Sequence, residues 1–188
     1  MRKLILQHYM SLDGYIADKE GGVGFIAEYA ALGDRTYIED AEASLDSVDT
    51  LLLGAKTYKL LEAYWPHAGG AEARFAEKLN ALQKVVVSNR LERAPWGSFP
   101  AATLVADPVA AASELKQGTG ASILVWGSVS VAQRLLNAGL VDEIQVRLCP
   151  CVLGEGHRLF DAPQWMELTE THRFEHGMLR LCYRPRSA

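Results

Sequence analysis

The chain has 188 residues, of which 49% are hydrophobic and 22% are charged, and its formal net charge at pH 7 is -4. This size and composition suit one globular domain over residues 1–188, which can bury roughly two-thirds of its unfolded surface without a disulfide or a metal. The negative charge argues against a nucleic-acid partner, and no apolar run reaches the roughly 18 residues of a membrane span.

The start of the chain, Met1 to His8, is basic and then apolar. It differs from a signal peptide because the apolar run is too short and no small-residue cleavage site follows. The three cysteines are odd in number and irregular in spacing, which fits reduced thiols. We therefore expect a cytoplasmic protein that does not associate with membranes.

Strand-like apolar runs alternate with helical patterns along the chain. In chain order, the predicted elements are a strand over 3–10, a helix over 35–45, a strand over 50–53, helices over 57–64 and 72–82, a strand over 84–88, a helix over 108–116, a strand over 122–126, a helix over 129–138 and strands over 143–149, 167–174 and 178–184. Asp34 and Asp107 are the predicted N-caps, and Gly139 is the predicted stop of the helix before it.

This alternation implies crossover connections and parallel pairing, whereas the last two strands form an antiparallel hairpin around His176-Gly177. The predicted fold class is α/β, with three α/β/α layers and a mixed, mostly parallel sheet. Ligands of such sheets bind beyond the carboxyl ends of the parallel strands.

Three predicted strand-to-helix junctions share one pattern, an apolar strand followed by Gly or Ser and a polar helix start. They are LLLGAKTY (51–58), VVVSNR (85–90) and LVWGSVS (124–130). A helix start offers free N–H groups and a partial positive charge to a phosphate. Gly54 and Gly127 would let a ligand approach the backbone, and Thr57 and Ser128 could add hydroxyl donors.

Two cations stand at these junctions. Lys56 and Arg90 together could hold a phosphate monoester, such as the one that distinguishes NADPH from NADH. Each feature alone has a simpler reading, in which the glycines make tight turns and Lys56 is a solvated charge. Three junctions in one short α/β chain favour a nucleotide site, because the strand ends of one sheet converge.

Other catalytic signatures are absent from the sequence. It holds no GxGxxG or Walker A loop, no GxSxG, no HExxH and no zinc deaminase motif, and its five histidines lack metal-ligand spacing. We therefore predict no metal site. A bound cofactor that carries the difficult chemistry is the favoured alternative.

The segment MSLDGYIA (10–17) leaves the first strand and turns at Asp13-Gly14. One interpretation is a simple turn, since Asp-Gly is a common turn dipeptide. The other is a loop over a cofactor, with Asp13 beside the reacting centre as a proton donor. That role requires the pKa of Asp13 to lie above its usual value of about 4.

Four segments resemble the dihydrofolate reductase-like family of riboflavin-biosynthesis reductase domains, the RibD C-terminal type, here as a standalone member. They are SLDGYIA, LLLGAKTY, VVVSNR and the long stretch LVWGSVSVAQRLLNAGLVDEIQVRLCPCVLGEGHRLF. The resemblance implies a three-layer fold of dihydrofolate reductase type. It also implies NADPH bound across the carboxyl ends of the strands, and it suggests a homodimer.

The resemblance also assigns residues to the cofactor and the substrate. It implies that the adenosine and phosphate half of NADPH contacts Gly54, Lys56 and Thr57, and that the 2′-phosphate lies near Ser88 and Arg90. It implies that the pyrophosphate and nicotinamide side lies over Gly127, Ser128 and Val129, and that the nicotinamide and substrate lie near Asp13.

Two departures from dihydrofolate reductases bear on the substrate. Trp126 precedes Gly127 where those enzymes carry a second glycine, and we expect it to fill the core or a pocket wall. Glu28, Glu39 and Asp40 lie where a pterin-binding carboxylate is expected, but none sits in a pterin motif, so folate is disfavoured.

The leading hypothesis is an NADPH-dependent reductase that transfers a hydride to a small substrate, heterocyclic (pyrimidine- or pterin-like) or ribosyl-linked. Asp13, or a water that it orients, is the candidate proton donor. A second hypothesis is a nucleotide-binding module of the same fold without turnover, since a fold does not guarantee a reaction. A third is a dimeric scaffold that binds no nucleotide.

Overall fold

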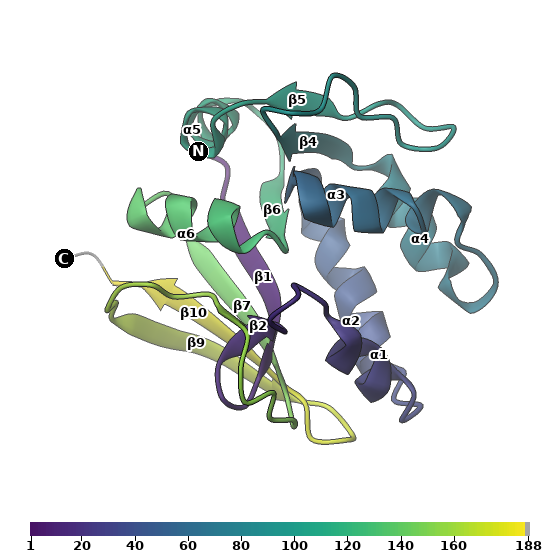
Figure 1. Ribbon diagram of the computed structural model, residues 1–188, viewed down its shortest axis with the longest axis vertical. Coiled ribbons are helices and arrows are strands. Elements are labelled where there is room, and N and C mark those ends of the chain that lie inside the picture. Colours follow the sequence, from purple (N-terminus) through teal and green to yellow (C-terminus); the bar gives the residue numbers. More distant parts are fainter. Residues whose placement is uncertain (187–188) are drawn as a thin grey trace.

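The computed structural model describes residues 1–186, and an eight-stranded sheet runs through it (Figure 1). The strands of this sheet are β1 (Leu4–Ser11), β3 (Val48–Gly54), β4 (Gln83–Val87), β5 (Thr103–Val105), β6 (Ser122–Trp126), β7 (Glu143–Cys149), β9 (Met166–Arg173) and β10 (Leu179–Pro185). A separate ribbon pairs β2 (Tyr15–Ala17) with β8 (His157–Arg158).

The helices connect these strands. They are α1 (Gly24–Ala30), α2 (Thr36–Ser44), α3 (Ala55–Glu62), α4 (Ala73–Ala81), α5 (Pro108–Gln117) and α6 (Val129–Asn137), with short 3-10 turns at Leu45–Ser47, Trp65–His67 and Gly70–Glu72. Among residues 1–186, no helix has the length and apolar character needed to cross a membrane.

The strand order is β5-β4-β3-β6-β1-β7-β10-β9. The first six strands are parallel, whereas β10 runs antiparallel to both β7 and β9. The mixed, mostly parallel sheet and the C-terminal antiparallel hairpin predicted from the sequence are therefore confirmed.

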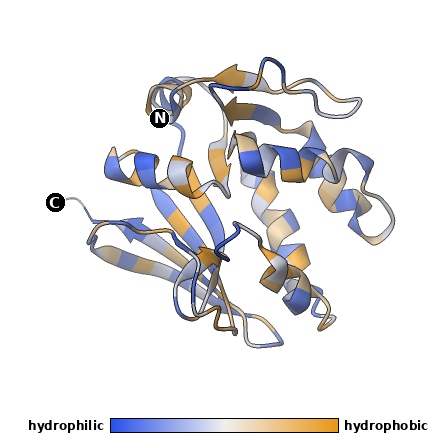
Figure 2. Cartoon of the chain, viewed as in Figure 1, coloured by the Kyte–Doolittle hydropathy of each residue, from blue (hydrophilic) through white to orange (hydrophobic). Residues whose placement is uncertain are grey.

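Both faces of the parallel part of the sheet are covered. Successive β1 residues point to opposite faces, so Leu4 and Leu6 pack in one core cluster with Leu135 of α6, whereas Ile5 packs in a second with Leu79 of α4. Figure 2 shows helices that alternate between hydrophobic and hydrophilic residues, as expected when only one side of each helix is buried. The predicted three-layer α/β/α architecture is confirmed.

Every predicted strand and helix is present, with ends that differ by at most two residues. Asp107 is confirmed as an N-cap, because its Oδ1 accepts hydrogen bonds from the amides of Val109 (2.8 Å) and Ala110 (2.9 Å). The prediction for Asp34 was wrong by one position. Arg35 is the N-cap of α2, and Asp34 supports the first turn from outside by accepting from the Thr36 amide at 2.9 Å.

Candidate functional site

The residues that follow β3, β4 and β6 lie side by side at the carboxyl end of the parallel strands. The prediction of a strand-to-helix junction was wrong for β4, because the Ser88 turn leads through a loop over residues 88–102 to β5. β3 pairs in parallel with β4 on one side and with β6 on the other, so their carboxyl ends are adjacent. α3 follows directly from β3, and α6 follows β6 after Gly127 and Ser128. The topology therefore brings together the residues that follow β3, β4 and β6.

The junctions after β3 and β6 interlock through their glycines. A Cβ atom on Gly54 would overlap the side chain of Ser128. A Cβ atom on Gly127 would lie 2.6 Å from Oγ1 and 2.7 Å from Cγ2 of Thr57. We expected both glycines to admit a ligand to the backbone, but the structure gives a different reason for them. Each makes room for a side chain of the other junction.

Ser128 has an unusual backbone conformation at the start of α6. Its φ of 58° makes it the one non-glycine residue with positive φ among residues 1–186, and it follows Gly127, whose φ is 57°. A left-handed conformation costs a residue with a Cβ roughly 1–2 kcal/mol. Such strain persists where the surroundings enforce it, and it clusters at functional sites.

Among the described residues 1–186, no side chain caps the helix starts at these two junctions. The first N–H groups of α3 and α6 therefore have no intrahelical partner. Within residues 1–186, the hydroxyls of Thr57 and Ser128 also make no hydrogen bond. Free amides, free hydroxyls and the helix dipole together suit an anion.

The cations of the first two junctions are exposed. Neither Lys56 nor Arg90 forms an ion pair with any residue of the described chain, 1–186. Ser88 builds the turn after β4, because its Oγ accepts hydrogen bonds from the amides of Arg90 (3.1 Å) and Leu91 (3.0 Å). Both cations are thus available to a ligand phosphate at this edge.

Trp126 belongs to the core side of the junction. Its indole N–H donates to Oε1 of buried Gln7 at 2.7 Å, and its ring stacks on Phe75 of α4 with centroids 6.0 Å apart. Gln7 in turn donates to Oε1 of Gln145 at 2.7 Å. These contacts fix Trp126 against α4, in agreement with the expectation that it fills the core or a pocket wall.

Asp13 is held by three donors at the end of β1. Its Oδ1 accepts from the Ser11 hydroxyl at 2.6 Å and from the Leu153 amide at 3.2 Å, and its Oδ2 accepts from the Gly154 amide at 2.7 Å. These bonds, chiefly the one from Ser11, lower the pKa of Asp13 to about 2. The shift is opposite to the one that a proton donor needs, so that requirement is not met.

A buried ion network that the sequence did not indicate lies beneath α2. Asp40 accepts from Arg147 of β7 at 2.6 Å and pairs with Arg180 of β10 at 3.0 Å. Arg147 is 1% exposed. An arginine in a strand is ordinarily expected to face solvent. Because Asp40 lies 107 residues away from Arg147 in the chain, no local sequence pattern indicates the pair. Asp40 is therefore engaged within the protein, whereas Glu28 and Glu39 are exposed.

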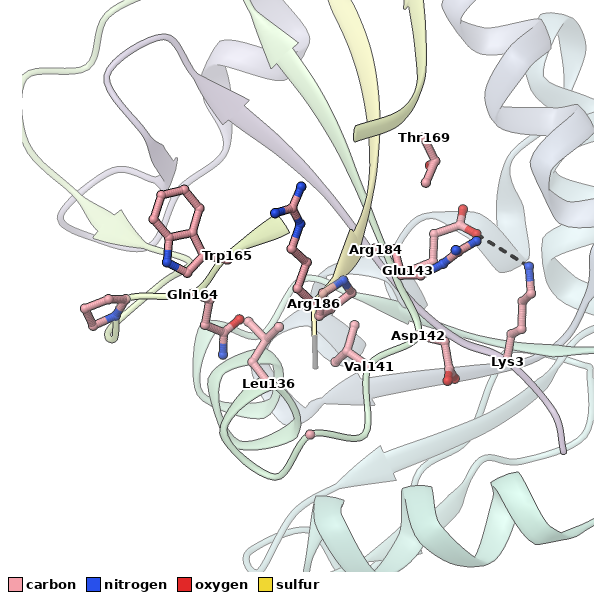
Figure 3. A pocket seen from close by; sticks show the side chains of 13 residues that line it. Lys3, Leu136, Val141, Asp142, Glu143, Gln164, Trp165, Thr169, Arg184 and Arg186 are labelled. Carbon is pink, nitrogen blue, oxygen red and sulfur yellow. Dashed lines mark ion pairs between the residues drawn. The ribbon is translucent and has the colours of Figure 1, made fainter. Parts of the chain in front are cut away.

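An open pocket of about 760 Å³ lies at the opposite edge of the sheet. Figure 3 shows Trp165 and Arg186 on one side of it, and Lys3 paired with Glu143 on the other. It is separate from the junctions. No cluster of three His, Cys, Asp or Glu side chains that could hold a metal ion occurs in the described part of the chain.

Known proteins resemble this chain over nearly its whole length. A family model described as the RibD C-terminal domain matches residues 2–179. An uncharacterised protein of Bacillus subtilis (strain 168), YyaP, is 28% identical over 187 residues, which cover 97% of this chain and 94% of that protein.

Two solved structures show the fold. A pyrimidine reductase-like protein from Corynebacterium diphtheriae aligns with a TM-score of 0.70 at 16% identity, covering 100% of this chain and 93% of that one. A dihydrofolate reductase from Enterococcus faecalis complexed with NADP(H) aligns with a TM-score of 0.62 at 11% identity, covering 98% and 97%. The fold is thus of dihydrofolate reductase type and, as the family model spans all but the ends of the sequence, the chain belongs to the RibD C-terminal domain family.

Proposed function

We propose that this chain is an NADPH-dependent reductase of a small heterocyclic substrate. The observation that carries the proposal is the pair of adjacent helix starts, α3 and α6. Within residues 1–186, their first amides have no side-chain cap, and Lys56 and Arg90 form no ion pair. The family supports the proposal, as does the likeness to a dihydrofolate reductase complexed with NADP(H).

The residues at this edge fit a dinucleotide with an extra phosphate. In the proposal, the first amides of α3 and α6 and the hydroxyls of Thr57 and Ser128, around Gly54 and Gly127–Val129, bind the pyrophosphate. Within residues 1–186, no side chain caps either helix start and neither hydroxyl makes a hydrogen bond. Lys56, Ser88 and Arg90 bind the 2′-phosphate, which NADH lacks. When bound, NADPH would supply the hydride.

Asp13 takes a positioning role in this proposal. A carboxyl group with a pKa of about 2 is charged at neutral pH and has no proton to give. Its contacts with the Leu153 and Gly154 amides instead hold the loop after β7 against the end of β1. Any proton that the reaction needs would come from a water that the Asp13 carboxylate orients.

The ion network under α2 bears on the substrate class. Asp40 is the α2 carboxylate that pairs with β7, and it already compensates Arg147 and Arg180. It is therefore not free to bind a pterin ring. We propose a pyrimidine-like or ribosyl-linked substrate rather than folate, in line with the likeness to a pyrimidine reductase-like protein.

A nucleotide-binding module without turnover is the second candidate. The charged state of Asp13 favours it, since this carboxylate has no proton to give to a substrate. Two measurements separate the candidates. NADPH should shift the amide NMR signals of Gly54 and Gly127 in both cases, but only a reductase consumes NADPH when a panel of pyrimidine substrates is added.

Two parts of the proposal rest on the resemblance and the family rather than on the site. The first is that the chain, acting as a single domain, forms a homodimer. The second is that it is located in the cytoplasm. Sedimentation of the purified protein at several concentrations tests the first. A sedimentation coefficient of a monomer at every concentration would remove the homodimer from the proposal.

A further inference from the structure

Lys84 differs from the other buried cations of the described chain. Four cationic side chains are buried among residues 1–186, namely Arg2, Lys84, Lys116 and Arg147. The other three each contact a carboxylate: Arg2 contacts Asp49, Lys116 contacts Asp142, and Arg147 contacts Asp40. No carboxylate of residues 1–186 lies within ion-pair distance of Lys84. Its charge therefore has no counter-ion within the described chain.

Hydrogen bonds link the neighbours of Lys84 to one another. Its Nζ donates to the backbone carbonyl of Asn80 in the last turn of α4 and lies 4.9 Å from the centre of the Trp96 ring. The Trp96 indole N–H donates to Oδ1 of Asn80 at 2.7 Å, and Asn80 donates to the carbonyl of Trp65 at 2.9 Å. Since an ammonium group has three donors, one carbonyl and one ring leave it incompletely satisfied.

Burial lowers the pKa of Lys84 to about 8. The carbonyl end of α4 carries a partial negative charge, which compensates only part of a full positive one. Burying an ion without a partner is costly, and proteins ordinarily supply one. The direction of the shift thus agrees with the missing counter-ion.

A cavity of about 340 Å³ lies beside Lys84. Leu82, Phe99 and Pro100 give it apolar walls, and Asn80 and Lys84 supply its buried polar groups. This volume and this mixture of an apolar wall with few polar groups are typical of small-molecule sites. The cavity lies at the amino end of β4, whereas Ser88 and the proposed NADPH site follow the carboxyl end of that strand.

We propose that this cavity is a second ligand site, which binds a small carboxylate with an apolar body. The carboxylate pairs with Lys84, and the body lies against Leu82, Phe99 and Pro100. The ligand supplies the counter-ion that the other three buried cations obtain from the chain itself. The site is independent of the proposed reductase activity.

The test uses benzoate and hexanoate as probes, without NADPH, so its outcome does not depend on the proposed function. Each probe should raise the melting temperature of the unmodified protein. It should also move the NMR titration of the Lys84 Cε signal to higher pH, because a bound anion favours the charged amine. If neither benzoate nor hexanoate changes the melting temperature or the Lys84 titration, the proposal is overturned.

Three variants locate the binding. Lys84→Met removes the charge, and Ala101→Trp fills the cavity but keeps the charge. Each should weaken benzoate binding at least tenfold. Lys59→Met, which removes an exposed lysine of α3, is the control and should bind benzoate as the unmodified protein does. Equal affinity of Lys84→Met and the unmodified protein contradicts the proposal. If Lys84→Met does not fold, Ala101→Trp and the Lys84 titration decide.

Discussion

Gly127 packs closely against Thr57 in the candidate site, and this contact gives a structural reason for the glycine. From the sequence, a glycine after a strand indicated a close approach of ligand to backbone. In the structure, the space that a Cβ atom would need is already taken by Thr57. The glycine pattern marked two junctions that do meet in the fold, but it could not distinguish a ligand from a neighbouring side chain.

We therefore expect Gly127→Ala to destabilise the fold and not only to weaken a ligand. The new Cβ meets Thr57, and the φ of 57° is unfavourable for alanine. The matched control is Gly139→Ala, where φ is 65° and nothing lies within 4 Å of the Cβ position. Thermal melts should show that Gly139→Ala lowers the free energy of unfolding by about 1–2 kcal/mol, the cost of a left-handed conformation for alanine. Gly127→Ala should lower it by more. Equal losses would show that the contact with Thr57 costs nothing.

Asp13 contacts the loop after β7 through the Leu153 and Gly154 amides. If it positions the loop after β7, Asp13→Asn should lower turnover and leave the affinity for NADPH nearly unchanged. The pH profile of turnover should keep its shape, because the Asp13 pKa of about 2 lies far below the working range. A profile that loses an ionisation in the variant would instead identify Asp13 as the group that titrates. Asp107→Asn, at a cap remote from this loop, serves as the control.

At the scale of elements, the long periodic segments were predictable and the short ones were not. Asp107 and Pro108 marked the start of α5, and alternating apolar runs marked the buried strands. α1 was missed because it begins at Gly24 after an N-cap valine, with no side-chain cap and no acidic residue in its first turn. β2, β5 and β8 have three residues or fewer, which is too short for a periodic pattern.

His8 on the central strand β1 gives a prediction for this element. It is buried, its Nε2 has no hydrogen-bond partner within residues 1–186, and desolvation lowers its pKa to about 4. The unfolded chain, with an ordinary pKa near 6.5, therefore binds a proton more readily than the folded one. The fold is therefore most stable, as far as His8 is concerned, above the unfolded-state pKa. That stability is lost as the pH falls from the unfolded-state pKa toward the folded-state pKa.

Urea unfolding measures this loss. As the pH is lowered from about 7 to about 5, His8 should decrease the free energy of unfolding by about 2 kcal/mol. A His8→Gln variant should lack this part of the pH dependence. His176→Gln, at an exposed position, should retain it. The same pH dependence in His8→Gln as in the unmodified protein would show that other groups are responsible.

On the scale of the whole molecule, the parallel sheet order determines where the candidate site lies. β4, β3 and β6 are neighbours, so junctions that are more than 30 residues apart in sequence meet at one edge. The sequence predicted this convergence from the strand–helix alternation alone. The Asp40–Arg147 pair is also a product of topology. It joins α2 to β7, and neither residue's local sequence indicates the other.

The most direct test of the central claim is the affinity for NADPH and for NADH, measured by isothermal titration. If Lys56 and Arg90 receive the 2′-phosphate, the unmodified protein should bind NADPH at least about tenfold more tightly, a difference of about 1.4 kcal/mol. The double variant Lys56→Met, Arg90→Met should lose most of that preference and bind NADH as before. Equal affinities for the two cofactors in the unmodified protein, or no binding of either, would contradict the account.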